Sequence, residues 1–221
     1  HINNKIDPLR DLEIIETEMK LADIDSIEKR LNKKNKKEID KTHNNILETT
    51  LKVINNNHEM DNILKNYDEK DLRSVGLLCL KPKLYVCNVD ENSIKNGNKY
   101  THLLYEKLNN KNIVIISAEI ENQINQLNIQ EKENYMKLLN INETGLSKLI
   151  KKSYKMLNLE TFFTSGPEES RAWTIKKNCK APEAAGVIHS DFEKGFIRAE
   201  TISFDDFIKH NGWLESKNNG K

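Results

Sequence analysis

The sequence contains little cysteine, and its distribution excludes several classes of protein. Cys79, Cys87 and Cys179 are odd in number, and no two of them have C-x-x-C spacing. This pattern argues against a disulfide framework and against a zinc site. We therefore expect a reduced, cytoplasmic protein.

Long apolar runs and a strong net charge are also missing. No stretch approaches the length of a membrane-spanning helix, and no signal-peptide pattern opens the chain, so we expect no membrane partner. The formal net charge is +1, so any basic surface must be local. The chain begins with His1 in place of Met, which is typical of a piece cut from something longer.

What the sequence does contain is charge and helical periodicity. Charged residues make up 31% of the chain and hydrophobic residues 37%, which favours a modest core with a long solvated element. Apolar residues recur at helical spacing over 11–31, nearly vanish from 32 to 45, and return over 46–54. We predict an antiparallel coiled-coil hairpin within residues 1–66.

A lysine cluster would lie at the tip of this hairpin. It is either a solvated helix end or an arm that contacts phosphate backbone. Its members are Lys33, Lys34, Lys36 and Lys37.

Residues 67–157 have α/β character. Apolar runs at 84–87 and 112–116 predict strands, and helices are expected near 99–108 and 145–157, with helix and loop over 120–142. Strand, helix, strand, helix is the order that forms a parallel sheet with covered faces.

A candidate ligand loop follows each of the two predicted strands. Asn88, Val89 and Glu91 come after the first, and Ser117 and Ala118 after the second. Because the carboxyl ends of parallel strands share one edge of a sheet, both loops are expected where ligands bind. An ordinary strand followed by a polar turn is the alternative.

The first of these loops resembles a nucleotide-base loop. In P-loop nucleotide proteins the corresponding strand ends in Asn-Lys-x-Asp, whose Asp accepts two hydrogen bonds from guanine. Here Val89 replaces the Lys and Glu91 replaces the Asp. A longer carboxylate cannot lie identically against guanine, so we expect strict guanine selectivity to be lost.

Residues 158–221 predict a smaller α+β unit. We expect a strand at 172–175, a helix at 181–186, a strand at 196–201 and a helix capped by Ser203, followed by a polar loop or tail from 213. This order resembles a β-grasp fold without its closing strands. Three of its basic residues form either a face for RNA backbone or solvated surface. These three are Lys180, Lys194 and Arg198.

Two segments of this unit carry a family resemblance. RAWTI (171–175) and KAPEAAGVIHSDFEKGFIRAE (180–200) closely resemble the TGS domain of the YchF family, the Obg-like ribosome-associated ATPases. Residues 162–166, and the start of the chain from Asp7 to Asp25, fit the same family. The resemblance implies the family's order of a coiled-coil insert (1–66), the back half of a P-loop G domain (67–157) and a truncated TGS domain (158–221).

The resemblance also implies a function. Asn88-x-x-Glu91 matches the family's Asn-x-x-Glu, which accompanies a preference for ATP over GTP. Members of the family bind and slowly hydrolyse ATP with Mg²⁺ and associate with ribosomes. The expected partners are therefore nucleotide and the ribosome, including ribosomal RNA.

The departures from the family limit what this chain can do. It contains no G-x-x-x-x-G-K-[ST] motif, hence no phosphate cradle and no Mg²⁺ ligand of that motif. We predict no catalytic residue and no metal site in the chain. His189 and Asp191 could form a catalytic pair, but no motif places a Ser or Cys nucleophile near them. The chain alone is expected to be inactive. The alternative is a non-catalytic coiled-coil and TGS module that binds the ribosome or RNA.

Overall fold

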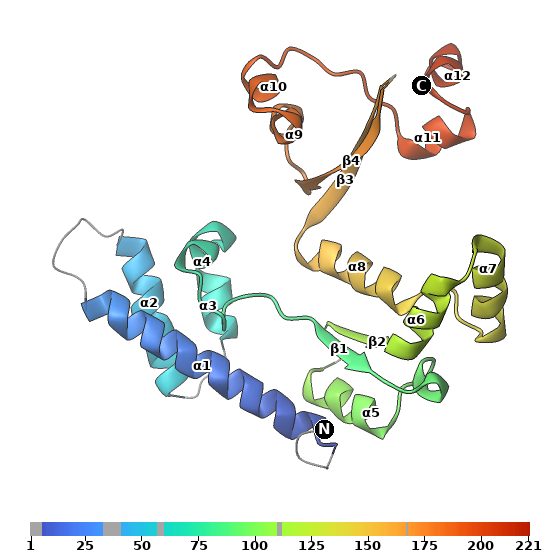
Figure 1. Cartoon of the computed structure of the whole chain (residues 1–221). Coiled ribbons are helices and arrows are strands. Elements are labelled where there is room, and N and C mark those ends of the chain that lie inside the picture. The colour runs from blue at the N-terminus through green and yellow to red at the C-terminus, as the bar shows by residue number, and fades with distance from the viewer. Residues whose placement is uncertain (1–5, 33–40, 57–59, 110–111, 167) are drawn as a thin grey trace. The chain divides into compact units, whose positions relative to one another are not determined.

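A pair of antiparallel helices opens the fold (Figure 1), and these are α1 (Pro8–Asn32) and α2 (Lys41–Asn55). The chain before α1 is fixed by Asp7, whose Oδ1 accepts a hydrogen bond from the Arg10 N–H at 3.2 Å. Pro8 follows at the start of the helix, where a missing N–H costs nothing. The two predicted helices are confirmed, while their description as a coiled coil stays a prediction.

The computed structural model describes residues 6–32, 41–56, 60–109, 112–166 and 168–221. The predicted lysine cluster at the hairpin tip lies outside these residues. It comprises Lys33, Lys34, Lys36 and Lys37.

Two short helices that the sequence pattern did not predict, α3 (Asp61–Asn66) and α4 (Glu69–Val75), pack against α2. The hairpin therefore shares one core with the chain that follows it, rather than burying only a stripe between its own helices. The buried members of this core are Ile27, Ile46, Leu47, Ile63, Val75, Leu77 and Leu80.

Asp23 in α1 fixes the chain after α4. It is 3% exposed, and its two carboxylate oxygens accept hydrogen bonds from the backbone N–H groups of Leu78, at 2.9 Å, and Cys79, at 2.8 Å. A buried carboxylate is tolerated where its oxygens are satisfied in this way.

The parallel sheet is confirmed as two strands, β1 (Tyr85–Asn88) and β2 (Ile113–Ile116), with Asn88 opposite Ile116. Between them lie a 3₁₀ turn, η1 (Glu91–Ser93), and α5 (Lys99–Lys107). The helix after β2 is α6 (Ala118–Gln126), and α7 (Ile129–Leu138) and α8 (Gly145–Met156) follow. A second small core beneath the carboxyl edge consists of Ile94, Ile120, Ile124 and Ile141.

Residues 1–153 and 154–221 form two compact units. The predicted domain boundaries at 66 and 157 stay predictions.

The second unit is built on an antiparallel hairpin, β3 (Leu159–Ser165) and β4 (Ser170–Lys176), in which Phe162 is opposite Trp173. The strand predicted at 172–175 is confirmed within β4, while β3 was not predicted. The Trp173 Nε1–H donates to Thr164 Oγ1 at 2.9 Å. After β4 come α9 (Ala181–Ile188), which covers the predicted helix, and α10 (Ser190–Lys194).

The prediction of a strand at 196–201 is wrong. These residues have no regular secondary structure, and Ile197 is 91% exposed. Alternation of apolar and polar residues specifies a strand only where a neighbouring strand satisfies its backbone groups, and no described strand pairs with this segment.

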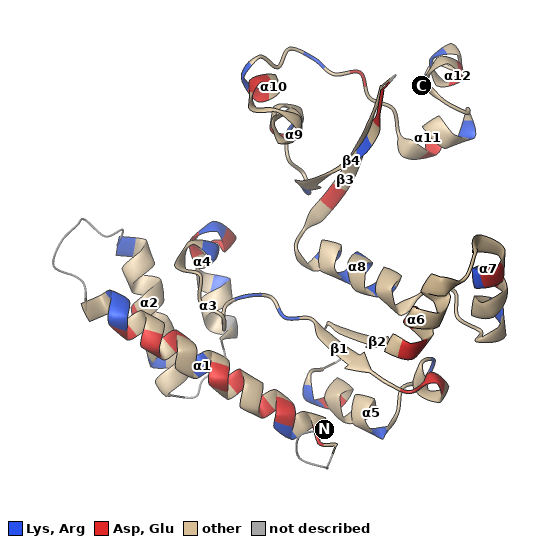
Figure 2. Cartoon of the chain, viewed as in Figure 1, with Lys and Arg blue, Asp and Glu red and all other residues tan. Residues whose placement is uncertain are grey.

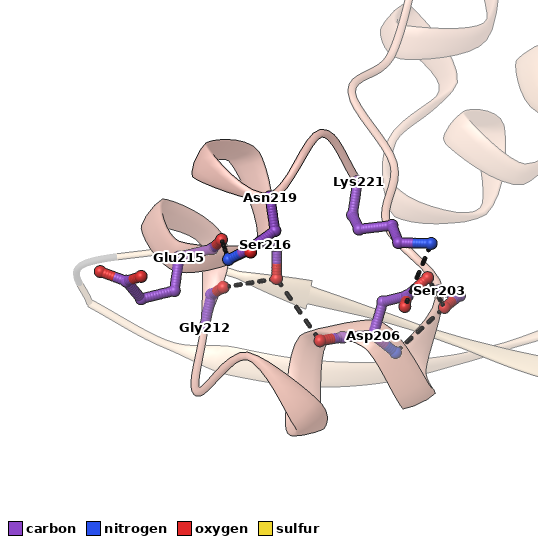
Figure 3. A network of polar contacts seen from close by, with 7 residues as sticks. All are labelled: Ser203, Asp206, Gly212, Glu215, Ser216, Asn219 and Lys221. Atoms are coloured by element: carbon purple, nitrogen blue, oxygen red, sulfur yellow. Dashed lines mark hydrogen bonds and ion pairs between the residues drawn. The ribbon is translucent and has the colours of Figure 1, made fainter.

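The prediction of a loop or tail from residue 213 is also wrong, because α12 (Trp213–Asn218) forms there. Figure 3 shows its contacts with α11 (Phe204–Lys209), whose cap by Ser203 is confirmed. The buried Ser216 Oγ donates to the carbonyl of Gly212 at 2.7 Å, and Lys221 Nζ lies 3.9 Å from Asp206 Oδ1. These local hydrogen bonds and this ion pair order residues 213–221, and a pattern of apolar residues cannot predict them.

No helix in the described part of the chain is long and apolar enough to cross a membrane.

Candidate nucleotide-base site

Asn88 joins the two loops at the carboxyl edge of the sheet. Its Oδ1 accepts the backbone N–H of Ala118, the first residue of α6, at 2.9 Å. The side chain of one strand end therefore caps the helix that begins at the next strand end, in the way that an N-cap residue satisfies an unpaired helix donor. Below this bond, the Val89 N–H donates to the Ile116 carbonyl at 2.9 Å and extends the pairing of β1 with β2.

The oxygen and the nitrogen of the Asn88 side-chain amide thus have different roles. Its oxygen holds the Ala118 loop, while its Nδ2 donor makes no hydrogen bond to another described residue. Asn88 is exposed, so this donor is accessible to a ligand at the edge of the sheet. Ala118 is exposed as well, but its N–H is already used by Asn88.

Glu91 is held from the side by residues that belong to neither predicted loop. Its Oε1 accepts a hydrogen bond from Gln123 Nε2 at 3.2 Å, and the same amino group donates to Glu119 Oε1 at 3.1 Å. The Tyr135 hydroxyl of α7 donates to Gln123 Oε1 and fixes the orientation of that amide. In the sequence, the only sign of this role is that Gln123 and Glu119 lie four residues apart, on one face of a helix. The same spacing is common on solvent-exposed helices, so it does not predict the role.

The loop between Asn88 and Glu91 is a tight turn with its own cap. Asp90 Oδ1 accepts hydrogen bonds from the Ser93 N–H at 3.0 Å and the Ser93 Oγ at 2.9 Å. Asp90 is therefore engaged within the turn, which leaves Glu91 as the carboxylate of this loop that can face a ligand. Val89 is partly buried and packs in the loop.

Ser117 lies at the end of β2 and is only 1% exposed. Its Oγ is buried and has no hydrogen-bond partner among the described residues, although Ser117 occupies the N-cap position of α6. A buried hydroxyl without a partner costs free energy. The site therefore offers one unused polar group just beneath its surface.

Cys87, next to Asn88, is buried, and burial raises the pKa of its thiol. It is an inert strand residue under the site, as its apolar run predicts.

The described residues at this edge of the sheet do not form a site for Mg²⁺. In the described ranges, no three His, Cys, Asp or Glu side chains are grouped so as to hold a metal ion. The sequence has no phosphate-binding loop motif.

The other predicted contact residues lie in the second unit. Lys180 is exposed at the N-cap position of α9, and Arg198 is exposed in the irregular segment after α10. His189 Nδ1 accepts the Asp191 N–H at 3.2 Å and caps α10, which is a structural role.

Comparison with known proteins places this geometry in a family. Residues 159–221 match the family model YchF-GTPase_C, described as a protein of unknown function (DUF933). The whole chain matches proteins named ribosome-binding ATPase YchF, with 38% identity to that of Bacillus subtilis and 41% to that of Haemophilus ducreyi. It spans 63% of the length of each.

A solved structure agrees with the sequence relatives. The chain matches the Schizosaccharomyces pombe YchF GTPase with a TM-score of 0.73 and 28% identity, over 100% of this chain and 62% of that one. The fold is therefore the mixed α/β fold of a P-loop G-domain family. The chain belongs to the YchF family.

Proposed function

We propose that this chain supplies the base-recognition part of a cytoplasmic P-loop nucleoside triphosphatase that binds ribosomes and prefers ATP to GTP. In this proposal residues 1–66 are a coiled-coil insert, 67–157 the back half of the G domain, and 158–221 an incomplete TGS domain of β-grasp type. The names of the relatives support ribosome binding and ATP hydrolysis. We propose that the Mg²⁺ that accompanies the nucleotide is bound by residues outside this chain.

The bond from the Ala118 N–H to Asn88 Oδ1, 2.9 Å long, carries the proposal. It ties the loops after β1 and β2 into one surface at the edge of a parallel sheet, where such folds bind ligands. Asn88, Val89, Glu91, Ser117 and Ala118 all belong to these two loops.

The environment of Glu91 supports adenine as the base. Gln123 already occupies Glu91 Oε1, while Oε2 has no hydrogen bond to another described residue. The carboxylate oxygen Oε2 can accept from the N6 amino group of adenine, the one donor group on the edge of that base. Guanine presents two adjacent donors, N1–H and the N2 amino group, and pairs best with both carboxylate oxygens, one of which is turned toward Gln123.

ATP hydrolysis by the whole native protein and by the 221-residue chain, measured side by side, tests this function. We expect slow hydrolysis by the whole protein and none above the blank by the chain. Hydrolysis by the chain that disappears in an Asn88→Ala variant would contradict the proposal.

For the chain by itself, a binding module without turnover is the second candidate, because its 221 residues contain no phosphate-binding loop motif. Such a module would bind the ribosome or its RNA with equal affinity whether or not ATP is present. Sedimentation with ribosomes, with and without ATP, separates the two candidates.

A further inference from the structure

The first unit contains a hollow whose lining includes none of the five residues proposed to contact the base. Its volume is about 540 Å³, and it opens between the turn after η1, which contributes Ile94 and Lys95, and the start of α8, which contributes Lys148 and Lys151. A second hollow of about 330 Å³ shares these four residues and extends to β2 and Lys152. Hollows of this size accommodate a small-molecule or nucleotide-sized group.

The walls of this hollow are basic because of the composition of α8. Gly145–Met156 contains four lysines and no acidic residue, and Figure 2 shows the helix with blue segments and no red. Lys148 lies three residues from Lys151 and four from Lys152, so the three side chains share a face. Lys95 brings a further positive charge from the opposite wall.

Glu143 supplies the negative charge among the residues that line the two hollows. Its Oε2 lies 2.5 Å from Lys151 Nζ, and this hydrogen bond lowers the pKa of Glu143, so the carboxylate stays ionised. Lys152 Nζ donates to the Ile113 carbonyl at 2.5 Å. Neither the Lys95 nor the Lys148 ammonium group makes a hydrogen bond or ion pair with another described residue. Positive charge therefore exceeds negative charge around the hollow.

The residues that line this hollow suit a ligand that combines anionic groups with polar hydroxyl groups. Lysine ammonium groups act as point charges for phosphate, and the amides of Asn140 and Asn142 on the rim can bond to sugar hydroxyls. A protein partner would instead need an apolar contact surface, and Ile94 and Ile141 are only 8% and 9% exposed.

We propose that Lys95, Lys148 and Lys151 bind the phosphodiester backbone of single-stranded ribosomal RNA in this hollow. The inference rests on the proposed ribosome binding and names the surface that performs it. It assigns this contact to the sheet-bearing unit, distinct from the predicted hairpin tip and from Lys180 and Arg198.

Fluorescence anisotropy of a labelled 12-nucleotide single-stranded RNA with the whole native protein tests the proposal. We expect the double variant K95A/K148A to bind about tenfold more weakly at low salt. The slope of log affinity against log salt should become shallower by about 1.4, since each lost phosphate contact on a single strand contributes about 0.7. The matched control K132A/K137A removes two lysines from α7 and should change affinity less than twofold.

Two outcomes of the anisotropy measurement would overturn the proposal. One is equal weakening by the two double variants, which would indicate a diffuse charge effect. The other is an RNA affinity that is unchanged in K95A/K148A. If this variant instead loses binding of a polyglutamate peptide, the hollow binds an acidic protein.

Sedimentation with ribosomes distinguishes a failure of the proposed function from a failure of this site. Wild-type protein that does not sediment contradicts the proposed function, whereas wild type and K95A/K148A that sediment equally contradict only this site.

Discussion

The side-chain oxygen of Asn88 accepts the backbone N–H of Ala118 at 2.9 Å, and this contact unites two loops that lie 30 residues apart in the chain. It also orients the Asn88 amide, because the oxygen is committed to the protein and the amino group is left toward solvent. Asn88 therefore has a structural half, its oxygen, and a ligand-facing half, its amino group. Substitutions can remove both groups or only the amino group.

Asn88→Ala removes both halves. We expect it to destabilise the protein by about 1 kcal/mol, the usual cost of losing a helix cap, and to weaken nucleotide binding. Asn88→Asp keeps the oxygen acceptor and should cost less than about 0.5 kcal/mol, a surface-scale effect, yet it should weaken nucleotide binding as well. Urea denaturation and nucleotide titration measure the two effects, and equal stability losses in both variants would contradict this division.

Asp23 anchors the chain after α4, and its removal should be far more costly than that of a neighbouring exposed acid. Asp23→Ala leaves two backbone N–H groups, those of Leu78 and Cys79, without their acceptor, at a cost of about 3 kcal/mol. Asp25→Ala is the matched control. It breaks an exposed ion pair with Lys29 and should cost less than about 0.5 kcal/mol. Similar urea midpoints for the two variants would refute the role of Asp23.

The contrast between Asp23 and the strands illustrates what can be predicted from the sequence. Apolar runs with β-branched residues specify β1 and β2, and their polar ends place Asn88 and Ser117 at one edge. Nothing in the sequence distinguishes Asp23, which is buried, from Asp25, which is exposed, because both belong to the same acidic helix. The support of Glu91 by Gln123 was equally hidden, since it depends on packing between α6 and α7.

The three thiols should differ in reactivity. Burial, and then the hydrogen bond to Asp23, raise the pKa of Cys79 to about 12, and burial also raises the pKa of Cys87. At pH 8 we expect iodoacetamide to label the partly exposed Cys179 first, and peptide mass spectrometry follows the order. In urea all three should react alike. Labelling of Cys79 as fast as Cys179 in the native protein would contradict the structure.

The same thiol predicts how stability changes in alkali. A folded-state pKa above the unfolded value favours folding most at low pH. The contribution of Cys79 is therefore complete below the unfolded pKa of about 8.5 and is lost as the pH rises through about 12. In urea titrations between pH 8 and 11, Cys79→Ala should lose stability less steeply than wild type. Parallel curves for the two proteins would show that the thiol makes no such contribution.

Gly145 allows close packing at the start of α8. A Cβ at this position would lie 2.7 Å from Ile116 Cγ2 and 3.0 Å from Glu121 Oε1, whose hydrogen bond from the Gly145 N–H is 2.6 Å long. We expect Gly145→Ala to destabilise the protein by about 2 kcal/mol through overpacking. Gly166→Ala, where the nearest atom is 3.9 Å away, is the control and should be near neutral. Thermal denaturation compares them, and a neutral Gly145→Ala would mean that Ile116 moves freely.

The relative affinities of ATP and GTP for the whole native protein and its Glu91→Asp variant test the central claim most directly. If the edge formed by Asn88 and Glu91 reads the base, wild type binds ATP more tightly. The shorter carboxylate, no longer within reach of Gln123, should then shift the ratio toward GTP by about tenfold or more. An unchanged ratio of the two affinities would contradict the assignment of this edge as the base site.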